Sequence, residues 1–246
     1  MRSRAIEPGP ATVSPVCVKI WRMSLRRWPV VGPVIAIAVG VVLSVVSVTF
    51  GPAPSAKADC PNVQLIFARG TAEPPGLGVV GDALFAALQP ALGSRTVDSY
   101  AVNYPASYNF LTTADAANDA RDHIAEMVDQ CPSTRLVLGG FSQGAAAISM
   151  LAGVPPVGQR IGNFGSAPPL DPALANKIRA VAVFGNPGNR FDTPLSSTGA
   201  FAGRTIDLCS EGDPVCVVGG RDRDAHHDYS APPYPGQAAS FIAGLV

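Results

Sequence analysis

Histidine is scarce in this sequence, with three residues in 246, so any chemistry that needs an imidazole base has few candidates. No C-x-x-C pair is present, which argues against a structural zinc site built on cysteine thiolates. No repeat or linker divides the chain either. These absences indicate a single domain, in which the few histidines and cysteines must each be explained.

Residues 1–58 have the composition of an export leader. Six basic residues precede an apolar run from Pro29 to Phe50, and Ala56-Lys57-Ala58 supplies a small-x-small cleavage site. The six are Arg2, Arg4, Lys19, Arg22, Arg26 and Arg27. We predict cleavage before Asp59. The alternatives are an uncleaved membrane anchor, since the apolar run is just long enough to span a bilayer, and a true start at Met23.

Positive charge is in deficit once the leader is set aside. Residues 1–58 hold seven Lys or Arg and one Glu, so residues 59–246 carry 11 basic and 17 acidic side chains, a net charge of −6. An acidic domain of this kind is a poor partner for nucleic acid or other anionic surfaces. Its 188 residues suit one domain with one substantial core.

The cysteine count is even after the leader, since Cys17 is removed with it. The four that remain in an exported chain predict two disulfides, for which three connectivities exist. Cys209 and Cys216 are seven residues apart around a Gly-Asp-Pro turn. The simplest pairing joins these two and leaves Cys60 to pair with Cys131.

Beyond residue 58, short apolar runs alternate with amphipathic segments. This predicts a single α/β domain over residues 59–246, with a parallel sheet covered by helices on both faces. The expected strands are Val63–Phe67, Thr96–Val102, Thr134–Leu138, Ile178–Phe184 and Thr205–Leu208, and the expected helices are Val79–Leu88, Asp115–Val128, Ala145–Leu151 and Pro235–Leu245. Residues 153–175 and 185–203 are expected as loops at one edge of the sheet, and His123 as a solvated surface residue.

The stretch Gly139-Gly140-Phe141-Ser142-Gln143-Gly144 stands between an expected strand and an expected helix. A serine at such a turn is held in a strained conformation with its hydroxyl clear of the sheet edge, and glycines let strand and helix approach closely. G-x-S-x-G alone is a weak signal. Its position, and a downstream acid and histidine in the order Ser, Asp, His, make Ser142 a candidate nucleophile.

A second glycine motif, Gly76-Leu-Gly-Val-Val-Gly81, matches the G-x-G-x-x-G of dinucleotide-binding domains. In those domains the tight turn begins directly after the strand. Here eight residues, including Pro74 and Pro75, follow Phe67 first. This interpretation is therefore disfavoured.

A serine hydroxyl becomes a good nucleophile when a base accepts its proton, and a carboxylate orients that base. His226 and His227 lie in a polar loop near the C-terminus, and one of them is the expected base. Asp213 lies between Cys209 and Cys216, where a small disulfide ring would hold it rigidly. It is the expected acid.

Together these motifs resemble those of the cutinases, specifically the secreted bacterial cutinase-like proteins of the α/β-hydrolase superfamily. The resemblance spans nearly all of residues 59–246. Its blocks are Ala68-Arg-Gly-Thr-Ala-Glu73, Tyr100-Ala-Val-Asn-Tyr-Pro105, Gly140-Phe-Ser-Gln-Gly144, Val183-Phe-Gly-Asn-Pro187, Cys209 to Cys216 and His226-His-Asp-Tyr229.

The resemblance implies a three-layer α/β/α domain with a central, mainly parallel five-stranded sheet. It implies Ser142 as nucleophile, Asp213 as orienting acid and, from the family's His-x-x-Tyr pattern, His226 as base. The oxyanion hole is expected from the backbone N–H of Gln143 together with Thr71. No metal or organic cofactor is implied.

One stretch departs from the fungal cutinases, which carry apolar residues just before the catalytic histidine. Residues 221–224 are Arg-Asp-Arg-Asp here, which argues against cutin as the substrate and favours short or medium acyl esters, lipids or triglycerides. We expect loop 153–175 to replace the missing apolar wall. Its apolar residues are Val154, Val157, Ile161, Phe164 and Leu170.

The sequence thus predicts a monomeric carboxylic ester hydrolase that acts on an ester or lipid substrate and has no nucleic-acid partner. We expect it to be secreted or retained at the cell envelope, with transient association with membrane or envelope. Two alternatives stay open: a phospholipase A or thioesterase that uses the same residues, and a secreted binding protein that has kept the fold and lost catalysis.

Overall fold

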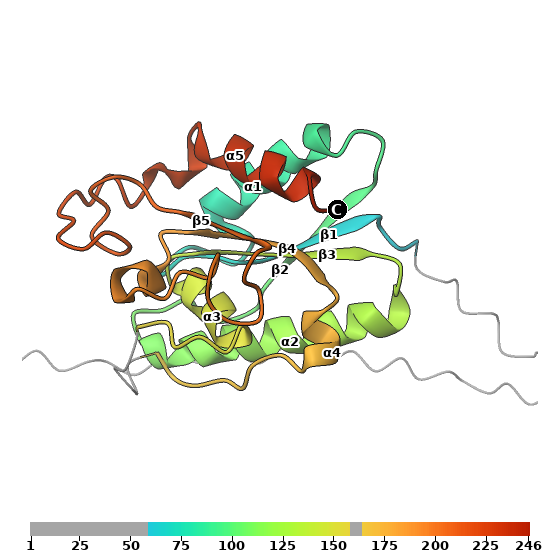
Figure 1. Ribbon diagram of the computed structural model, residues 1–246, viewed down its shortest axis with the longest axis horizontal. Coiled ribbons are helices and arrows are strands. Elements are labelled where there is room, and N and C mark those ends of the chain that lie inside the picture. The colour runs from blue at the N-terminus through green and yellow to red at the C-terminus, as the bar shows by residue number, and fades with distance from the viewer. Residues whose placement is uncertain (1–58, 158–163) are drawn as a thin grey trace, which may run out of the picture. The chain divides into compact units, whose positions relative to one another are not determined.

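The computed structural model describes residues 59–157 and 164–246, so the predicted leader lies outside the described residues. Five strands form one sheet in the order β2-β1-β3-β4-β5, and every pairing is parallel (Figure 1). The strands are β1 (Val63–Ala68), β2 (Val97–Ala101), β3 (Arg135–Phe141), β4 (Ile178–Phe184) and β5 (Thr205–Leu208). The predicted five-stranded parallel sheet is confirmed.

Helices cover both faces of the sheet (Figure 1). On one face lie α1 (Gly78–Ala91) and α5 (Tyr234–Ala243); on the other lie α2 (Thr113–Gln130), α3 (Gln143–Leu151) and the short α4 (Pro172–Ala175). Each face has its own apolar core, so every residue of the inner strand β1 is buried, as expected in a sheet covered on both sides. Short 3₁₀ helices occur at η1 (Phe110–Thr112), η2 (Pro187–Phe191) and η3 (Asp228–Ser230).

The order of the strands fixes where a site can form. The chain passes from β1 outward to β2, then returns across β1 to β3 and continues to β4 and β5. The connections that leave β1 and β3 therefore run in opposite directions. At such a switch point in the strand order, a crevice opens outside the carboxyl ends of the two strands. Thr71 follows β1 and Ser142 follows β3, so two of the residues singled out in the sequence lie at this switch point.

Two disulfides join the pairs that the cysteine spacing predicted. Cys60 and Cys131 connect the segment before β1 to the end of α2, with their Cα atoms 5.5 Å apart. Cys209 and Cys216 close a short loop after β5, with Cα atoms 6.0 Å apart. The first closes a loop of 71 residues and is of the kind that contributes about 2 to 4 kcal/mol by constraining the unfolded chain.

The prediction that segments 153–175 and 185–203 lie at one edge of the sheet is wrong. The parts of them that the structure describes contain α4 and η2, and they contact the C-terminal end of α3. The backbone N–H of Leu170 donates to Leu151, and that of Ala200 donates to Ala152. Val154 and Leu170 are buried in the core of that face, so they do not form the expected apolar wall, and Ile161 lies outside the described residues.

The prediction that His123 is a solvated surface residue is also wrong. Its side chain is 13% exposed, its ring stacks on Tyr100 with 3.5 Å between centroids, and its Nε2 lies 2.9 Å from Gln64 Oε1. Burial lowers the pKa of His123, although nearby carboxylates act in the opposite direction. Helical periodicity identifies the side of α2 that faces away from the core. It does not show that the edge strand β2 places the ring of Tyr100 against that side.

Within residues 59–157 and 164–246, no helix is both long enough and apolar enough to cross a membrane.

Candidate active site

The turn from β3 into α3 places Ser142 at its tip, with φ 52° and ψ −110°. Residues other than glycine rarely adopt a positive φ, so this conformation is held by its surroundings. A Cβ at Gly144 would collide with the carbonyl oxygen of Ala68, and one at Gly140 would lie 2.6 Å from the Gly144 carbonyl. The two glycines of G-x-S-x-G are therefore needed because α3 begins in backbone contact with β1 and β3.

Ser142 faces one of the two candidate histidines. Its Oγ lies 2.9 Å from His226 Nε2, and His226 Nδ1 lies 2.9 Å from Asp213 Oδ2. A carboxylate can only accept hydrogen bonds, so Nδ1 carries the proton and Nε2 is left to accept the proton of the serine hydroxyl. His227 is exposed, and its ring centroid lies 5.8 Å from that of His226.

Asp213 is completely buried. Its Oδ2 accepts from His226 and from the Tyr229 hydroxyl at 2.5 Å, and its Oδ1 accepts from the backbone N–H of Val215 at 2.7 Å. Burial alone would raise the pKa of Asp213, but these hydrogen bonds outweigh it and hold the pKa below its ordinary value. The ionised carboxylate is thus available to stabilise a protonated imidazole.

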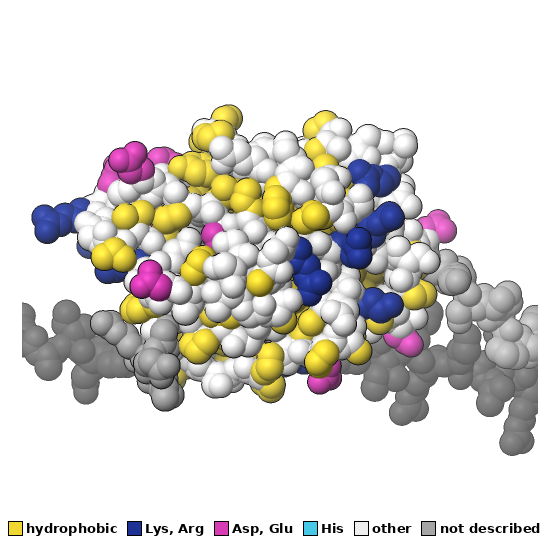
Figure 2. Space-filling view, viewed as in Figure 1, with side chains coloured by type: hydrophobic (Ala, Val, Ile, Leu, Met, Phe, Trp, Pro, Cys, Tyr) yellow, Lys and Arg dark blue, Asp and Glu magenta, His cyan; other side chains and the backbone are white. Residues whose placement is uncertain are grey.

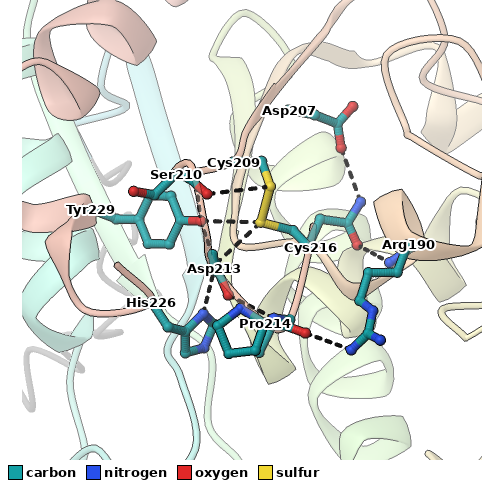
Figure 3. The surroundings of a disulfide bond; sticks show 12 residues. Arg190, Asp207, Cys209, Ser210, Asp213, Pro214, Cys216, His226 and Tyr229 are labelled. Atoms are coloured by element: carbon teal, nitrogen blue, oxygen red, sulfur yellow. Dashed lines mark hydrogen bonds and ion pairs between the residues drawn. A yellow bond between two sulfur atoms is a disulfide. The ribbon is translucent and has the colours of Figure 1, made fainter. Parts of the chain in front are cut away.

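Tyr229 is a part of the site to which the sequence analysis gave no role (Figure 3). It is fully buried, and its hydroxyl accepts from the backbone N–H of Ser210 at 2.9 Å while it donates to Asp213. Burial, and then the hydrogen bond to Asp213, raise the pKa of Tyr229, so it stays a donor. The signal was present in the sequence, because this tyrosine closes the His-x-x-Tyr block.

The loop that carries Asp213 is fastened from three sides (Figure 3). Cys216 Sγ lies 3.2 Å from Asp213 Oδ2; a disulfide sulfur has no proton to donate, so this is a packing contact. Arg190 Nη1, from η2, donates to the carbonyl of Pro214 at 2.5 Å. The disulfide, Tyr229 and Arg190 together hold the carboxylate at a fixed distance from the histidine.

Thr71 and Gln143, the expected oxyanion residues, lie side by side. Thr71 Oγ1 donates to Gln143 Oε1 at 3.0 Å, and Gln143 Nε2 donates to Thr113 Oγ1 at 3.1 Å. Gln143 is buried and is the first residue of α3, whose N-terminal end favours negative charge. The side chain of Gln143 therefore fixes both Thr71 and the first turn of α3 beside Ser142.

A buried arginine holds the loop on which Thr71 lies. Arg69 is 4% exposed, and its guanidinium donates to the backbone carbonyls of Glu73, Val102 and Tyr104. The Tyr104 hydroxyl returns a hydrogen bond to the carbonyl of Arg69. These bonds tie the loops after β1 and β2 together, a role that the sequence analysis missed even though Arg69 belongs to one of the quoted blocks.

The start of α1 is occupied by a side chain of the protein. Glu73 Oε1 accepts from the backbone N–H of Val79, and its Oε2 accepts from that of Gly70. A dinucleotide would place its pyrophosphate against this helix terminus, where the carboxylate now lies. The geometry thus argues against a dinucleotide-binding site at the G-x-G-x-x-G motif. No group of three or more His, Cys, Asp or Glu in the described part of the chain is placed to hold a metal ion.

The charged stretch before His226 shapes the turn that carries it. Residues 221–224 are exposed, and Asp222 Oδ1 accepts from the backbone N–H groups of Asp224 and Ala225. This is an Asx-type turn, in which a short carboxylate replaces backbone hydrogen bonds. The Asp222 carboxylate thus acts within the loop itself.

We expect Gly185→Ala to lower kcat by about 10² while the protein stays folded. Gly185 directly follows β4 and has φ 56°, and a Cβ there would lie 2.9 Å from His226 Cε1 and 3.1 Å from Nδ1. A shift of about 1 Å in a catalytic group costs roughly 10² in rate. Steady-state hydrolysis of a soluble ester measures the effect. Gly236→Ala is the control, since no atom lies within 4 Å of a Cβ there; equal rates for both variants would contradict the prediction.

Comparison with known proteins agrees with the geometry. The sequence model of the family described as Cutinase matches residues 59–246. Phospholipase Culp4 of Mycobacterium tuberculosis (strain ATCC 25618 / H37Rv) is 47% identical over 195 residues, which cover 79% of this chain and 83% of that protein. Carboxylesterase Culp1 of the same strain is 35% identical over 221 residues, 87% of this chain and 94% of that protein.

Among solved structures, a Trichoderma reesei cutinase in complex with a C11Y4 phosphonate inhibitor is 34% identical, with a TM-score of 0.60 over 76% of this chain and 77% of that one. The family match covers residues 59–246, and these two relatives are 47% and 35% identical to this chain over the aligned residues. This chain therefore belongs to the cutinase family.

Proposed function

We propose that this chain is a secreted serine esterase that hydrolyses carboxylic esters through Ser142, His226 and Asp213. Membership of the cutinase family makes it a carboxylic ester hydrolase. The observation that supports the finer assignment is the unbroken set of contacts from Ser142 Oγ through both ring nitrogens of His226 to Asp213. These contacts lie at the switch point of the sheet, where α/β folds bind their ligands.

In the first half of the reaction, Ser142 Oγ attacks the ester carbonyl while its proton passes to His226 Nε2. Asp213, hydrogen-bonded to Nδ1, stabilises the imidazolium that forms. Negative charge develops on the carbonyl oxygen, and we assign the backbone N–H of Gln143 and Thr71 as its donors. His226 then protonates the leaving alkoxide, and the acyl group remains bonded to Ser142.

The second half regenerates the enzyme. A water molecule loses a proton to His226 as it attacks the acyl-enzyme, and the same donors stabilise the second tetrahedral intermediate. The proton on His226 then returns to Ser142 Oγ as the carboxylic acid leaves. Every proton transfer in the cycle uses Nε2, because Nδ1 stays bonded to Asp213.

Apolar side chains next to the oxyanion residues favour substrates with an acyl chain. Thr113, which contacts Gln143, donates to the carbonyl of Phe110, and the ring of Phe110 stacks on that of Phe164 at 5.0 Å. Tyr108 and Leu111, in the same connection between β2 and α2, are 78% and 55% exposed. We infer that this connection, with Phe164, supplies the apolar wall that the charged stretch before His226 does not.

A phospholipase A is the second candidate. The relative described as phospholipase Culp4 is 47% identical, and cleavage of a glycerophospholipid ester needs the same nucleophile, base and oxyanion donors. Two disulfides support export to an oxidising compartment, in line with the leader predicted for residues 1–58. Export would bring the enzyme to the lipids of the envelope.

The proposal is tested with residues 59–246, which contain both disulfides, all five strands and both apolar cores. We expect this segment to hydrolyse p-nitrophenyl esters across a series from about two to sixteen acyl carbons, as other serine esterases do. An alkyl phosphonate should inactivate it and add its mass to the peptide that contains Ser142. A parallel assay on phosphatidylcholine decides the second candidate. No hydrolysis of any ester, with no phosphonate adduct, would favour the binding-protein alternative.

A further inference from the structure

On the face of the domain in Figure 2, both signs of charge are mixed. Lys and Arg lie on its left and on its right side, and so do Asp and Glu, with apolar side chains between them. Such a surface selects no ionic partner. The buried polar side chains next to Ser142 are more informative, because a buried polar group is nearly always hydrogen-bonded.

A chain of hydrogen bonds joins the start of α2 to the loop that follows β1. Thr71 Oγ1 lies 3.0 Å from Gln143 Oε1, and Gln143 Nε2 lies 3.1 Å from Thr113 Oγ1. Thr113 is the first residue of α2, and its Oγ1 lies 2.7 Å from the carbonyl oxygen of Phe110. Thr113 is fully buried and Gln143 is 2% exposed, so these bonds form away from solvent, where an unpaired polar group is costly.

The direction of this chain is set at Phe110. A carbonyl oxygen can only accept, and a threonine hydroxyl has one proton, so Thr113 donates that proton to Phe110. Toward Gln143 it can therefore act only as an acceptor. The amide of Gln143 must turn its NH₂ to Thr113 and its Oε1 to Thr71, because the opposite orientation would place two acceptors against each other.

The hydroxyl of Thr71 is engaged as a result. It faces an acceptor, Gln143 Oε1, and donates its single proton there, so that proton is not available to a substrate oxygen. The backbone N–H of Thr71 has no acceptor among the described residues, whereas that of Ala72 donates to the carbonyl of Ala106. Of the two donors on Thr71, the backbone N–H is therefore the free one.

The orientation of the Gln143 amide determines which donor Thr71 offers. With the amide reversed, its NH₂ would donate to the Thr71 hydroxyl, and the hydroxyl proton would be free to point at the substrate. With the amide as it lies here, Thr71 is left with its backbone N–H. The first N–H groups of a helix have no partner within the helix, so the N–H of Gln143, the first residue of α3, is available as the second donor.

We propose that Thr113 is a positioning residue for the oxyanion donors. By accepting from Gln143 it orients the amide, which engages the hydroxyl of Thr71 and leaves the backbone N–H of Thr71 to bind the oxyanion. Thr113 touches no reacting atom and acts through Gln143 and Thr71. This role rests on the proposed esterase function, and it adds a residue of α2 to a site otherwise built from the segments that follow β1, β3 and β5.

The first test is Thr113→Val, which keeps the size of the side chain and removes the acceptor of Gln143. We expect kcat for a soluble p-nitrophenyl ester to fall about tenfold, the scale of one neutral hydrogen bond, with KM unchanged, because the interaction is made in the transition state. An alkyl boronic acid, whose tetrahedral adduct places an oxygen at the oxyanion donors, should also bind about tenfold more weakly. Thr113→Ser, which keeps the hydroxyl, should restore both values.

The matched control is Thr205→Val, at the start of β5 and at the edge of the sheet away from Ser142. The Thr205 hydroxyl is also buried and also donates to a backbone carbonyl, that of Phe201, at 2.9 Å. Its loss should leave kcat at the value of the parent. An equal fall in both valine variants, or no fall in Thr113→Val, would overturn this inference alone; a parent that hydrolysed no ester would overturn the proposed function as well.

Thr71→Val tests the other end of the chain and decides the matter if Thr113→Val does not fold, judged by circular dichroism. It removes the hydroxyl and keeps the backbone N–H, so we expect a fall in kcat of about tenfold. The double variant Thr71→Val/Thr113→Val should lose no more than either single variant, because both act on one amide. Removal of a direct oxyanion donor costs about 10² to 10³ in kcat; a loss of that size in Thr71→Val would show that the hydroxyl itself binds the oxyanion and would overturn the proposal.

Discussion

Ser142→Ala is expected to lower kcat/KM for a p-nitrophenyl ester by about 10³ or more and to leave the fold intact. The substitution removes only Oγ, which bonds to His226 Nε2. The backbone at position 142 keeps its N–H bond to the Phe184 carbonyl, so the turn, α3 and the oxyanion donors stay in place. Residual hydrolysis should come from water activated by His226 and stabilised by those donors.

The matched control is Ser149→Ala, the same chemical change within α3, the helix that Ser142 precedes. Ser149 is buried, and its hydroxyl bonds to the carbonyl of Ala145 one turn earlier, which adds little to a helix. Its second contact, with Asn186 Oδ1, is long at 3.5 Å. Activity should be unchanged in this variant. Circular dichroism and the thermal midpoint check both proteins. If Ser142→Ala kept a rate near that of the parent, a different nucleophile would have to be sought.

Much of the fold could be predicted because the information is local in the sequence. The β4 and β5 bounds match their expected ranges, Ile178–Phe184 and Thr205–Leu208, since apolar runs buried on both faces end sharply at polar or glycine residues. The turn at Ser142 could also be predicted. Gly140, Ser142 and Gly144 are three positions of one turn, so their spacing alone describes the backbone that they must form.

Other parts of the site depend on residues far apart in the chain. Gly185 is needed because a Cβ at this position would collide with His226, about forty positions later in the chain, and no pattern near residue 185 indicates this. The same holds for Tyr229, whose hydroxyl reaches back to Asp213. Sequence periodicity predicts which side of an element faces the core, but the contacts between loops are set by tertiary packing. Consequently, the residues that position Ser142, His226 and Asp213 were harder to identify from the sequence than these three candidates themselves.

Asp213→Asn should lower kcat by about 10⁴, the scale on which a triad loses rate when its acid becomes an amide. All the polar partners of Asp213 are donors: His226 Nδ1, the Tyr229 hydroxyl and the Val215 N–H. An asparagine must present its NH₂ to at least one of these donors. If that partner is His226, the imidazole takes the other tautomer and its Nε2 can no longer accept the serine proton.

The same variant should lose stability in a pH-dependent way. Hydrogen bonds hold the pKa of Asp213 below its ordinary value in the fold, whereas in the unfolded chain an Asp titrates near pH 3.9. The ionised carboxylate therefore adds stability above about pH 4, and that stability is lost as pH falls through the folded pKa. Urea denaturation should thus show Asp213→Asn less stable than the parent by about 2 kcal/mol at pH 7, with the difference narrowing below about pH 4.

The control is Asp82→Asn, at an exposed position in α1, which should have the same free energy of unfolding as the parent at neutral and at acidic pH. If the loss of stability in Asp213→Asn did not become smaller in acid, its cause would be packing and not charge.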